Sequence, residues 1–283
     1  MKITKRTILI ALSLVMAISA TAFGTIAYLT DRQSVTNTFT YGDVNITLDE
    51  SKVDENGNPM FPVEGEDDLY VSMDEDGTIT VTKGDESADV GEDGKVTIGD
   101  TTYEVELDEN GGIVVNGKPM GENPRVTENE YKLVPGMSYL KDPTVTVAGG
   151  SEKSYVRMKV TFTNYTALNA LAAKGGYTDV MAMFIPVTSS EWTQFGTTSI
   201  DTVANTITYE FRYNTAVAPG TEAVVVPALF DEITVPIFVE GEDLEALQTA
   251  GGFQIDVTGY AVQAAGFADA DAAWIACDDQ LGE

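Results

Sequence analysis

Short segments in which apolar and polar residues alternate recur along most of the chain. In residues 154–164 the apolar residues fall at every second position, with Arg157 and Lys159 among the polar residues between them. Residues 205–214 and 253–264 alternate in the same way. A period of two with one apolar face is typical of antiparallel strands that pack on a core on one side and meet water on the other. The pattern therefore predicts strands that leave Arg157 and Lys159 exposed.

Helical signals are few and short. Residues 166–174 are rich in alanine and are followed by two glycines, residues 241–252 begin with acidic residues and end in glycines, and residues 269–276 form a final candidate helix. Residues 180–187 are an uninterrupted apolar run of strand length, for which we expect a buried strand. Many short strands with turns between them predict a mainly β fold, an antiparallel β-sandwich of jelly-roll type with a few short helices.

One stretch of the chain differs in character from the rest. Between Asp49 and Glu130 lie 24 of the 45 acidic residues and only five basic ones. Short strand-like pieces in this stretch alternate with Asp-Gly and Asn-Gly turns, which favour hairpins. We therefore expect residues 51–127 to form a small acidic β-hairpin module, inserted into a sandwich domain made of residues 28–50 and 128–283.

The N-terminal segment has the order of a secretory signal. Basic residues precede an apolar run from Ile8 to about Phe23, and small residues follow it. This pattern predicts a signal peptide over residues 1–27, with cleavage between Ala27 and Tyr28. The alternative is an uncleaved anchor that displays the domain on the membrane, because the apolar stretch is long enough to span about 30 Å of hydrocarbon. Apart from such an anchor we expect no membrane association.

Charge and residue content exclude several classes of function. The chain has a formal net charge of −29, and removal of residues 1–27 takes away three basic residues and leaves −32. Nucleic acid and anionic lipid surfaces repel such a protein. The chain lacks histidine, the usual zinc ligand and general base, and its one cysteine, Cys277, cannot close an intrachain disulfide. No nucleophile elbow, P-loop or Cys-x-x-Cys motif is present. We expect neither an enzyme nor a cofactor.

The acidic turns raise the question of calcium. Asp74 and Asp76 flank one glycine-containing turn, and Asp108 and Asn110 flank another, so these four residues are weak candidate ligands. Neither turn continues into the twelve-residue pattern of an EF-hand loop. Solvated hairpin turns are the favoured interpretation, and weak calcium binding is the alternative.

The segments GTIAYLTD (residues 24–31) and NTFTYGDVNITLDE (residues 37–50) together resemble the TasA/camelysin family of Gram-positive bacteria. Residues 131–147 and the C-terminal segment beginning at Ile255 resemble the same family, whereas residues 52–127 depart from its shorter members. Members of this family are exported through a dedicated signal peptidase of the SipW type and populate the cell surface and biofilm matrix. The resemblance therefore implies secretion by that peptidase, with related matrix proteins as partners.

The resemblance further implies a non-catalytic structural protein that forms fibres. The segment freed at Tyr28, with Leu29, Val35 and Phe39, would pair with an open sheet edge of another copy. One alternative is a monomeric surface module that binds a ligand through the acidic insert. Camelysin-like proteins are also associated with proteolysis, and a protease is the less favoured alternative.

Overall fold

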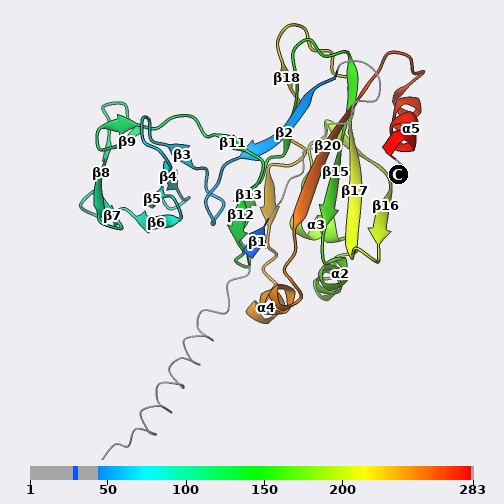
Figure 1. The fold of residues 1–283 in the computed structure, drawn as a ribbon. Helices are drawn as coiled ribbons and strands as arrows, with labels where there is room; N and C mark the ends of the chain where they lie inside the picture. The colour runs from blue at the N-terminus through cyan, green and yellow to red at the C-terminus, as the bar shows by residue number, and fades with distance from the viewer. Residues whose placement is uncertain (1–27, 31–43, 282–283) are drawn as a thin grey trace, which may run out of the picture.

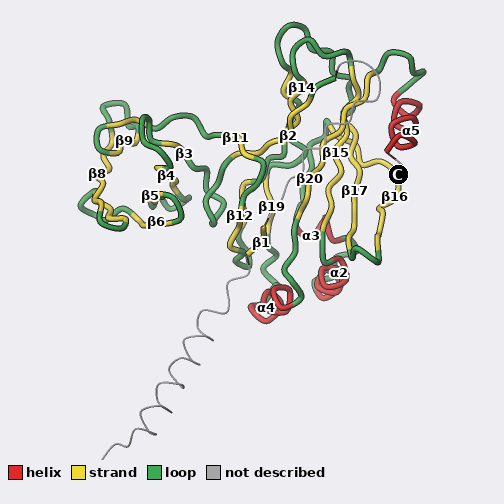
Figure 2. The backbone as a smooth tube through the Cα atoms, in the orientation of Figure 1, coloured by secondary structure: helices red, strands yellow, loops and turns green. Residues whose placement is uncertain are grey.

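The computed structural model describes residues 28–30 and 44–281, and the other residues are drawn in grey in Figure 1. Within the described residues, strands arranged in antiparallel sheets predominate over four short helices (Figure 2). The predicted mainly β, antiparallel class is confirmed. Two small two-stranded sheets join β1 (Tyr28–Thr30) to β12 (Glu130–Lys132) and β13 (Ser138–Leu140) to β19 (Glu232–Thr234).

Two four-stranded antiparallel sheets face each other in a sandwich. The first contains, in order, β11 (Arg125–Val126), β2 (Ile46–Ser51), β14 (Thr144–Val147) and β18 (Val224–Val225). The second contains, in order, β16 (Trp192–Asp201), β17 (Thr206–Tyr213), β15 (Ser154–Phe162) and β20 (Ile255–Gln263). A glycine allows the two sheets to approach closely, because a Cβ added at Gly259 of β20 would lie 3.2 Å from a methyl of Val145 on β14.

The core of the sandwich is built from the alternating positions of its strands. In β15, Val156, Met158, Val160 and Phe162 are all fully buried. Removing each such side chain from water stabilises the fold by about 1.5–3 kcal/mol. The period-two pattern of the sequence thus gives the inward face of this central strand correctly.

The predicted exposure of Arg157 is wrong, because its side chain is completely buried. The helix α5 (Ala270–Leu281) covers the outer face of the second sheet at this point, and its residue Trp274 packs over the guanidinium at 4.5 Å from the ring centroid. Arg157 Nη2 donates to Asp278 of the same helix at 2.5 Å. Alternation predicted the direction of the side chain, but the distant helix decided whether it meets water.

The helices lie at the margins of the sheets. α2 (Tyr165–Lys174) and α4 (Gly241–Thr249) are neighbours at one end of the sandwich (Figure 1), where Lys174 Nζ donates to Asp243 at 2.7 Å. With α5, they confirm the three helices expected from the sequence.

The strand expected over residues 180–187 is wrong, because residues Val180–Phe184 form the short helix α3. Asp179 caps this helix by accepting a hydrogen bond from the Ala182 backbone N–H at 2.9 Å. Val180, Met181, Met183 and Phe184 are all buried. A run that is apolar at every position carries no period, so it cannot by itself distinguish a buried helix from a buried strand.

A second departure is β16, whose sequence does not alternate and which the sequence analysis missed. Its pairing with β17 shifts register between Phe195 and Ser199, and Gly196 in this interval has a φ of +72°. Such a bulge interrupts the period of two, and the pattern is lost although the strand is long.

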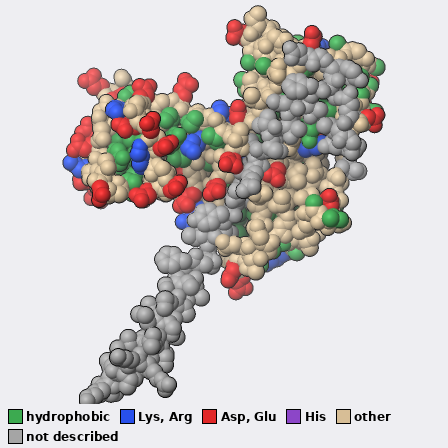
Figure 3. Space-filling view, viewed as in Figure 1, with side chains coloured by type: hydrophobic (Ala, Val, Ile, Leu, Met, Phe, Trp, Pro, Cys, Tyr) green, Lys and Arg blue, Asp and Glu red, His purple; other side chains and the backbone are tan. Residues whose placement is uncertain are grey.

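The acidic insert consists of two further antiparallel sheets of four strands each. One contains β3 (Phe61–Pro62), β4 (Leu69–Met73), β5 (Ile79–Lys83) and β6 (Glu86–Asp89), and the other contains β10 (Lys118–Pro119), β9 (Ile113–Val115), β8 (Thr101–Leu107) and β7 (Lys95–Ile98). They enclose a hydrophobic core of their own, in which Val81 and Val115 are fully buried. Red carboxylate groups are distributed over the visible surface of this insert (Figure 3).

The insert leaves and rejoins the sandwich at adjacent strands. β2 precedes it and β11 follows it, and these two strands pair with each other in the first sheet. Arg125 fastens the junction, since its Nε donates to Asp49 at 2.8 Å and its Nη1 donates to Asp142 at 2.6 Å. One step further, the Lys52 N–H donates to the Pro124 carbonyl at 2.9 Å.

The turn 54–57 holds the start of the insert against the sandwich. Its Glu55 carbonyl accepts from the Lys132 N–H of β12 at 2.7 Å. Gly57 has a φ of +84° and lies against Tyr139 so closely that an added Cβ would be 2.7 Å from the Tyr139 Cα. Only glycine meets both demands, namely the left-handed backbone and the close approach.

We expect Gly57→Ala to destabilise the protein more than Gly77→Ala. Gly77 occupies the same position of a similar turn, with a φ of +85°, but nothing lies within 4 Å of an added Cβ. The left-handed backbone should cost about 1–2 kcal/mol in both variants, and the overlap with Tyr139 should cost Gly57→Ala about 1–3 kcal/mol more. Urea unfolding followed by circular dichroism measures both. Equal losses would contradict a close contact at Gly57.

Candidate functional site

The N-terminal strand β1 lies on β12 of the same chain. Tyr28 is opposite Lys132, Leu29 is opposite Tyr131, and Thr30 is opposite Glu130, in an antiparallel pair. Tyr28 and Leu29 are the two expected assembly residues that the structure describes. Val35 and Phe39, like the cleavage residue Ala27, lie outside the described residues.

The strand that receives β1 is fixed firmly to the sandwich. Tyr131 of β12 is fully buried, and its ring meets that of Tyr139 edge-on with centroids 5.7 Å apart. The Tyr131 hydroxyl donates to the Leu140 carbonyl at 3.0 Å, and burial raises its pKa well above the usual value. The Tyr139 hydroxyl in turn donates to the Lys132 carbonyl at 2.6 Å. β12 is therefore a rigid platform for an added strand.

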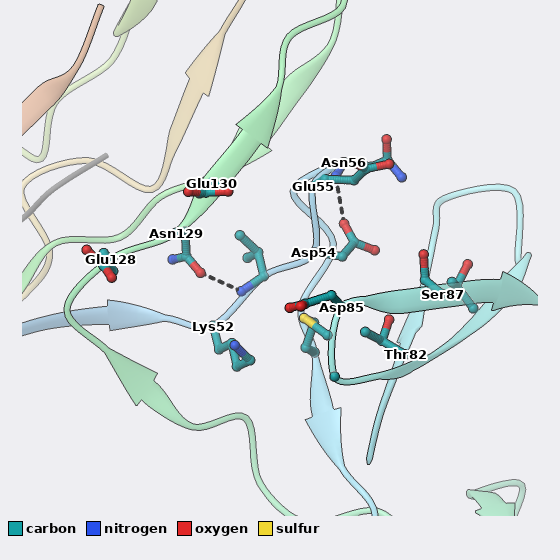
Figure 4. A pocket seen from close by; sticks show the side chains of 14 residues that line it. Lys52, Asp54, Glu55, Asn56, Thr82, Asp85, Ser87, Glu128, Asn129 and Glu130 are labelled. Atoms are coloured by element: carbon teal, nitrogen blue, oxygen red, sulfur yellow. Dashed lines mark hydrogen bonds between the residues drawn. The ribbon is translucent and has the colours of Figure 1, made fainter. Parts of the chain in front are cut away.

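A polar cleft separates the insert from this platform. It encloses about 540 Å³ between the hairpin of β5 and β6 on one side and the residues leading into β12 on the other (Figure 4). Its charged lining residues are Lys52, Asp54, Glu55, Asp85, Glu128 and Glu130. Both walls carry carboxylates, so the cleft favours a cationic or hydrogen-bond-donating guest.

Two of the cleft carboxylates are already engaged within the protein. Asp54 accepts from the backbone N–H groups of Asn56 and Asn58 at 2.9 Å each, and from the Ser72 hydroxyl at 2.7 Å. Glu55 pairs with Lys132 at 3.7 Å. These contacts position the turn 54–57, so they give the wall of the cleft its shape rather than its reactivity.

Three buried polar side chains lie behind the cleft wall, and the sequence analysis missed them. Glu50 and Lys141 form an ion pair at 2.8 Å in which both side chains are fully buried. Asn129 donates to the other Glu50 oxygen at 2.7 Å. Glutamate in strand β2 looks like one more residue of the acidic stretch, and no local signal marks it as buried. Only the position of Glu50 and Leu48 at alternate residues of one strand hints at the shared inward face.

The four weak metal candidates do not converge. Asp74 accepts from the Thr78 N–H at 2.8 Å, and Asp108 accepts from the N–H groups of Asn110 and Gly112 at 2.8 Å each, so each carboxylate closes its own turn. Asp76 and Asn110 are exposed. Within residues 28–30 and 44–281 no three His, Cys, Asp or Glu side chains are grouped so that they could hold a metal ion.

Comparisons with protein-family models, with curated proteins and with solved structures find no match to this chain. Among the helices in the part of the chain that the structure describes, none is long and apolar enough to cross a membrane.

We expect Asp108→Ala to destabilise the insert by about 1–2 kcal/mol, because two backbone N–H groups lose their acceptor. Asp108→Asn keeps an oxygen acceptor at the same place and should lose much less. Millimolar calcium should leave the wild-type unfolding midpoint unchanged, since the carboxylate is occupied by its turn. A midpoint that rises with calcium in the wild type, but not in Asp108→Asn, would instead make this turn a metal site.

Proposed function

We propose that the chain is a secreted, non-catalytic structural protein of the cell surface or biofilm matrix that assembles by exchanging β1 between copies. The observation that carries the proposal is the pairing of β1 with β12 as an isolated two-stranded sheet. β1 begins at Tyr28, the residue that the predicted cleavage would leave at the N-terminus. The resemblance of the N-terminal segments to the TasA/camelysin family supports export and assembly.

The geometry of the exchange is undemanding. Residues 31–43 separate β1 from the first described residue of the sandwich, and covalent geometry lets such a segment reach at most about 45 Å. In another copy, the same strand meets the same β12 edge with the same register, so exchange exchanges equivalent contacts. Main-chain hydrogen bonds supply the affinity, and joining each copy to the next extends a fibre.

The acidic surface shapes the conditions under which copies meet. A mature charge of −32 opposes close approach at low ionic strength, and salt weakens this repulsion within a Debye length of about 10 Å at 0.1 M. Assembly through β1 therefore belongs to an environment that contains salt or basic partners.

Paired cysteines test whether β1 crosses between chains. Thr30→Cys and Glu130→Cys place thiols at register partners of β1 and β12. Strand exchange predicts disulfides between chains, seen as a ladder of covalent oligomers without reductant. A control pair, Ser138→Cys with Thr234→Cys, bridges β13 and β19 and should link only within one chain. Assembled protein that yields only cross-linked monomers from the first pair would refute exchange.

The cleft supports a second candidate, a surface module that binds a ligand through the insert. Its acidic walls come from two parts of the chain, each with its own hydrophobic core. A guest bound there would contact both parts at once, and basic peptide side chains suit the carboxylates at Glu128 and Glu130.

Excision of residues 54–123 separates the two candidates. The Lys52 N–H donates to the Pro124 carbonyl, so a two-residue Asn-Gly turn should rejoin β2 and β11. A structural subunit should still assemble after this excision, as sizing and electron microscopy would detect. Loss of assembly in a protein whose circular dichroism still reports a folded sandwich would instead place the essential contacts in the insert.

A further inference from the structure

Glu50, Asn129 and Lys141 meet at one buried carboxylate. Lys141 Nζ donates to Glu50 Oε2 at 2.8 Å, and Asn129 Nδ2 donates to Glu50 Oε1 at 2.7 Å. Glu50 is fully buried, and Lys141 and Asn129 are 1% and 5% exposed. An amine, an amide and a carboxylate are therefore held together away from water.

We propose that Lys141 and Asn129 become joined by an intramolecular isopeptide bond, with Glu50 transferring the proton. The carboxylate lies between the amine that would attack and the amide nitrogen that would leave, and it touches both. This arrangement matches the needs of an acyl transfer, in which one group must take a proton from the nucleophile and give it to the leaving group.

The environment activates the nucleophile. A lysine attacks only as the neutral amine, and burial lowers the pKa of Lys141 to about 7. The carboxylates of Asp256 and Asp142 act in the opposite direction and favour the charged form. The balance leaves the neutral amine accessible near neutral pH, whereas an exposed lysine would be almost entirely protonated.

The amide is held in a way that favours attack at its carbonyl carbon. The backbone N–H of Val53 donates to Asn129 Oδ1 at 3.0 Å, so a donor already faces the oxygen on which negative charge would develop. Asn129 Nδ2 also donates to the Ser51 carbonyl at 2.9 Å. These bonds orient the amide plane and fix which of its two ends meets Glu50.

The reaction balances without a cofactor. Glu50 takes a proton from the Lys141 ammonium, and Nζ then forms a bond to the Asn129 Cγ. A second proton passes from Nζ through the carboxylate to Nδ2, the Cγ–Nδ2 bond breaks, and ammonia leaves. With the proton first taken up by Glu50, it departs as ammonium. No oxidant or reductant is consumed, and Glu50 returns to a carboxylate.

The bond would staple the platform on which β1 lies. Asn129 immediately precedes β12 and Lys141 immediately follows β13, so the link closes a loop that contains both strands and the buried pair Tyr131 and Tyr139. A cross-link here resists separation of the platform from the sandwich under tension. The inference rests on the buried triad alone and holds whether or not β1 is exchanged.

Mass spectrometry of the purified wild-type protein tests the proposal directly. Loss of ammonia predicts an intact mass about 17 Da below that calculated for the N-terminus actually found. After trypsin, residues 126–132 should appear joined to residues 133–153, with no cleavage after Lys141. A full calculated mass together with free peptides ending at Lys132 and Lys141 would overturn the proposal and leave the triad an ion pair.

Three variants assign the roles. Lys141→Arg removes the nucleophile and Glu50→Gln removes the proton carrier, so both proteins should have their full calculated masses. Lys153→Arg alters an exposed lysine nearby and should keep the deficit. If a triad variant does not fold, the wild-type peptides still decide. A deficit retained in folded Glu50→Gln would overturn the role of Glu50, and a deficit that maps to other peptides would overturn the bond itself.

Discussion

The buried contact between Lys141 and Glu50 is the interaction on which the rest of this structure depends. Taking two charges out of water costs several kcal/mol per ion, and only close, complete pairing offsets that cost. Asn129 completes the set, so β2, β12 and the segment after β13 must meet at one point. Removing one partner would leave another charge buried, which is far more damaging than losing an exposed ion pair.

From this junction the two cores extend in opposite directions. The sandwich core gathers strands from both ends of the sequence, whereas the core of the insert is made only from residues within Val63–Val115. Because β2 and β11 are paired neighbours, the insert interrupts the first sheet without disturbing its order. The turn 54–57, with Gly57 against Tyr139, is the further contact that couples the insert to the sandwich.

The same junction gives the N-terminal strand its place. β12 carries β1 through main-chain pairing, while its Tyr131 is buried beneath and Lys132 is tied to the turn of the insert. A strand held by a few backbone bonds on a firmly anchored edge exchanges between copies more readily than one buried on both faces. Rigidity of the receiving edge and weakness of the added strand are thus complementary features of the proposed assembly.

The sequence by itself determined the strands of the second sheet that alternate, the hairpins of the insert and the helices α2, α4 and α5, since their signals are periods and turns within a few neighbouring residues. It did not determine α3, the bulged β16 or the burial of Arg157. Nor did it locate the triad, whose members Glu50 and Lys141 are 91 residues apart. Burial depends on which distant segments cover a side chain, and only the tertiary structure brings those segments together.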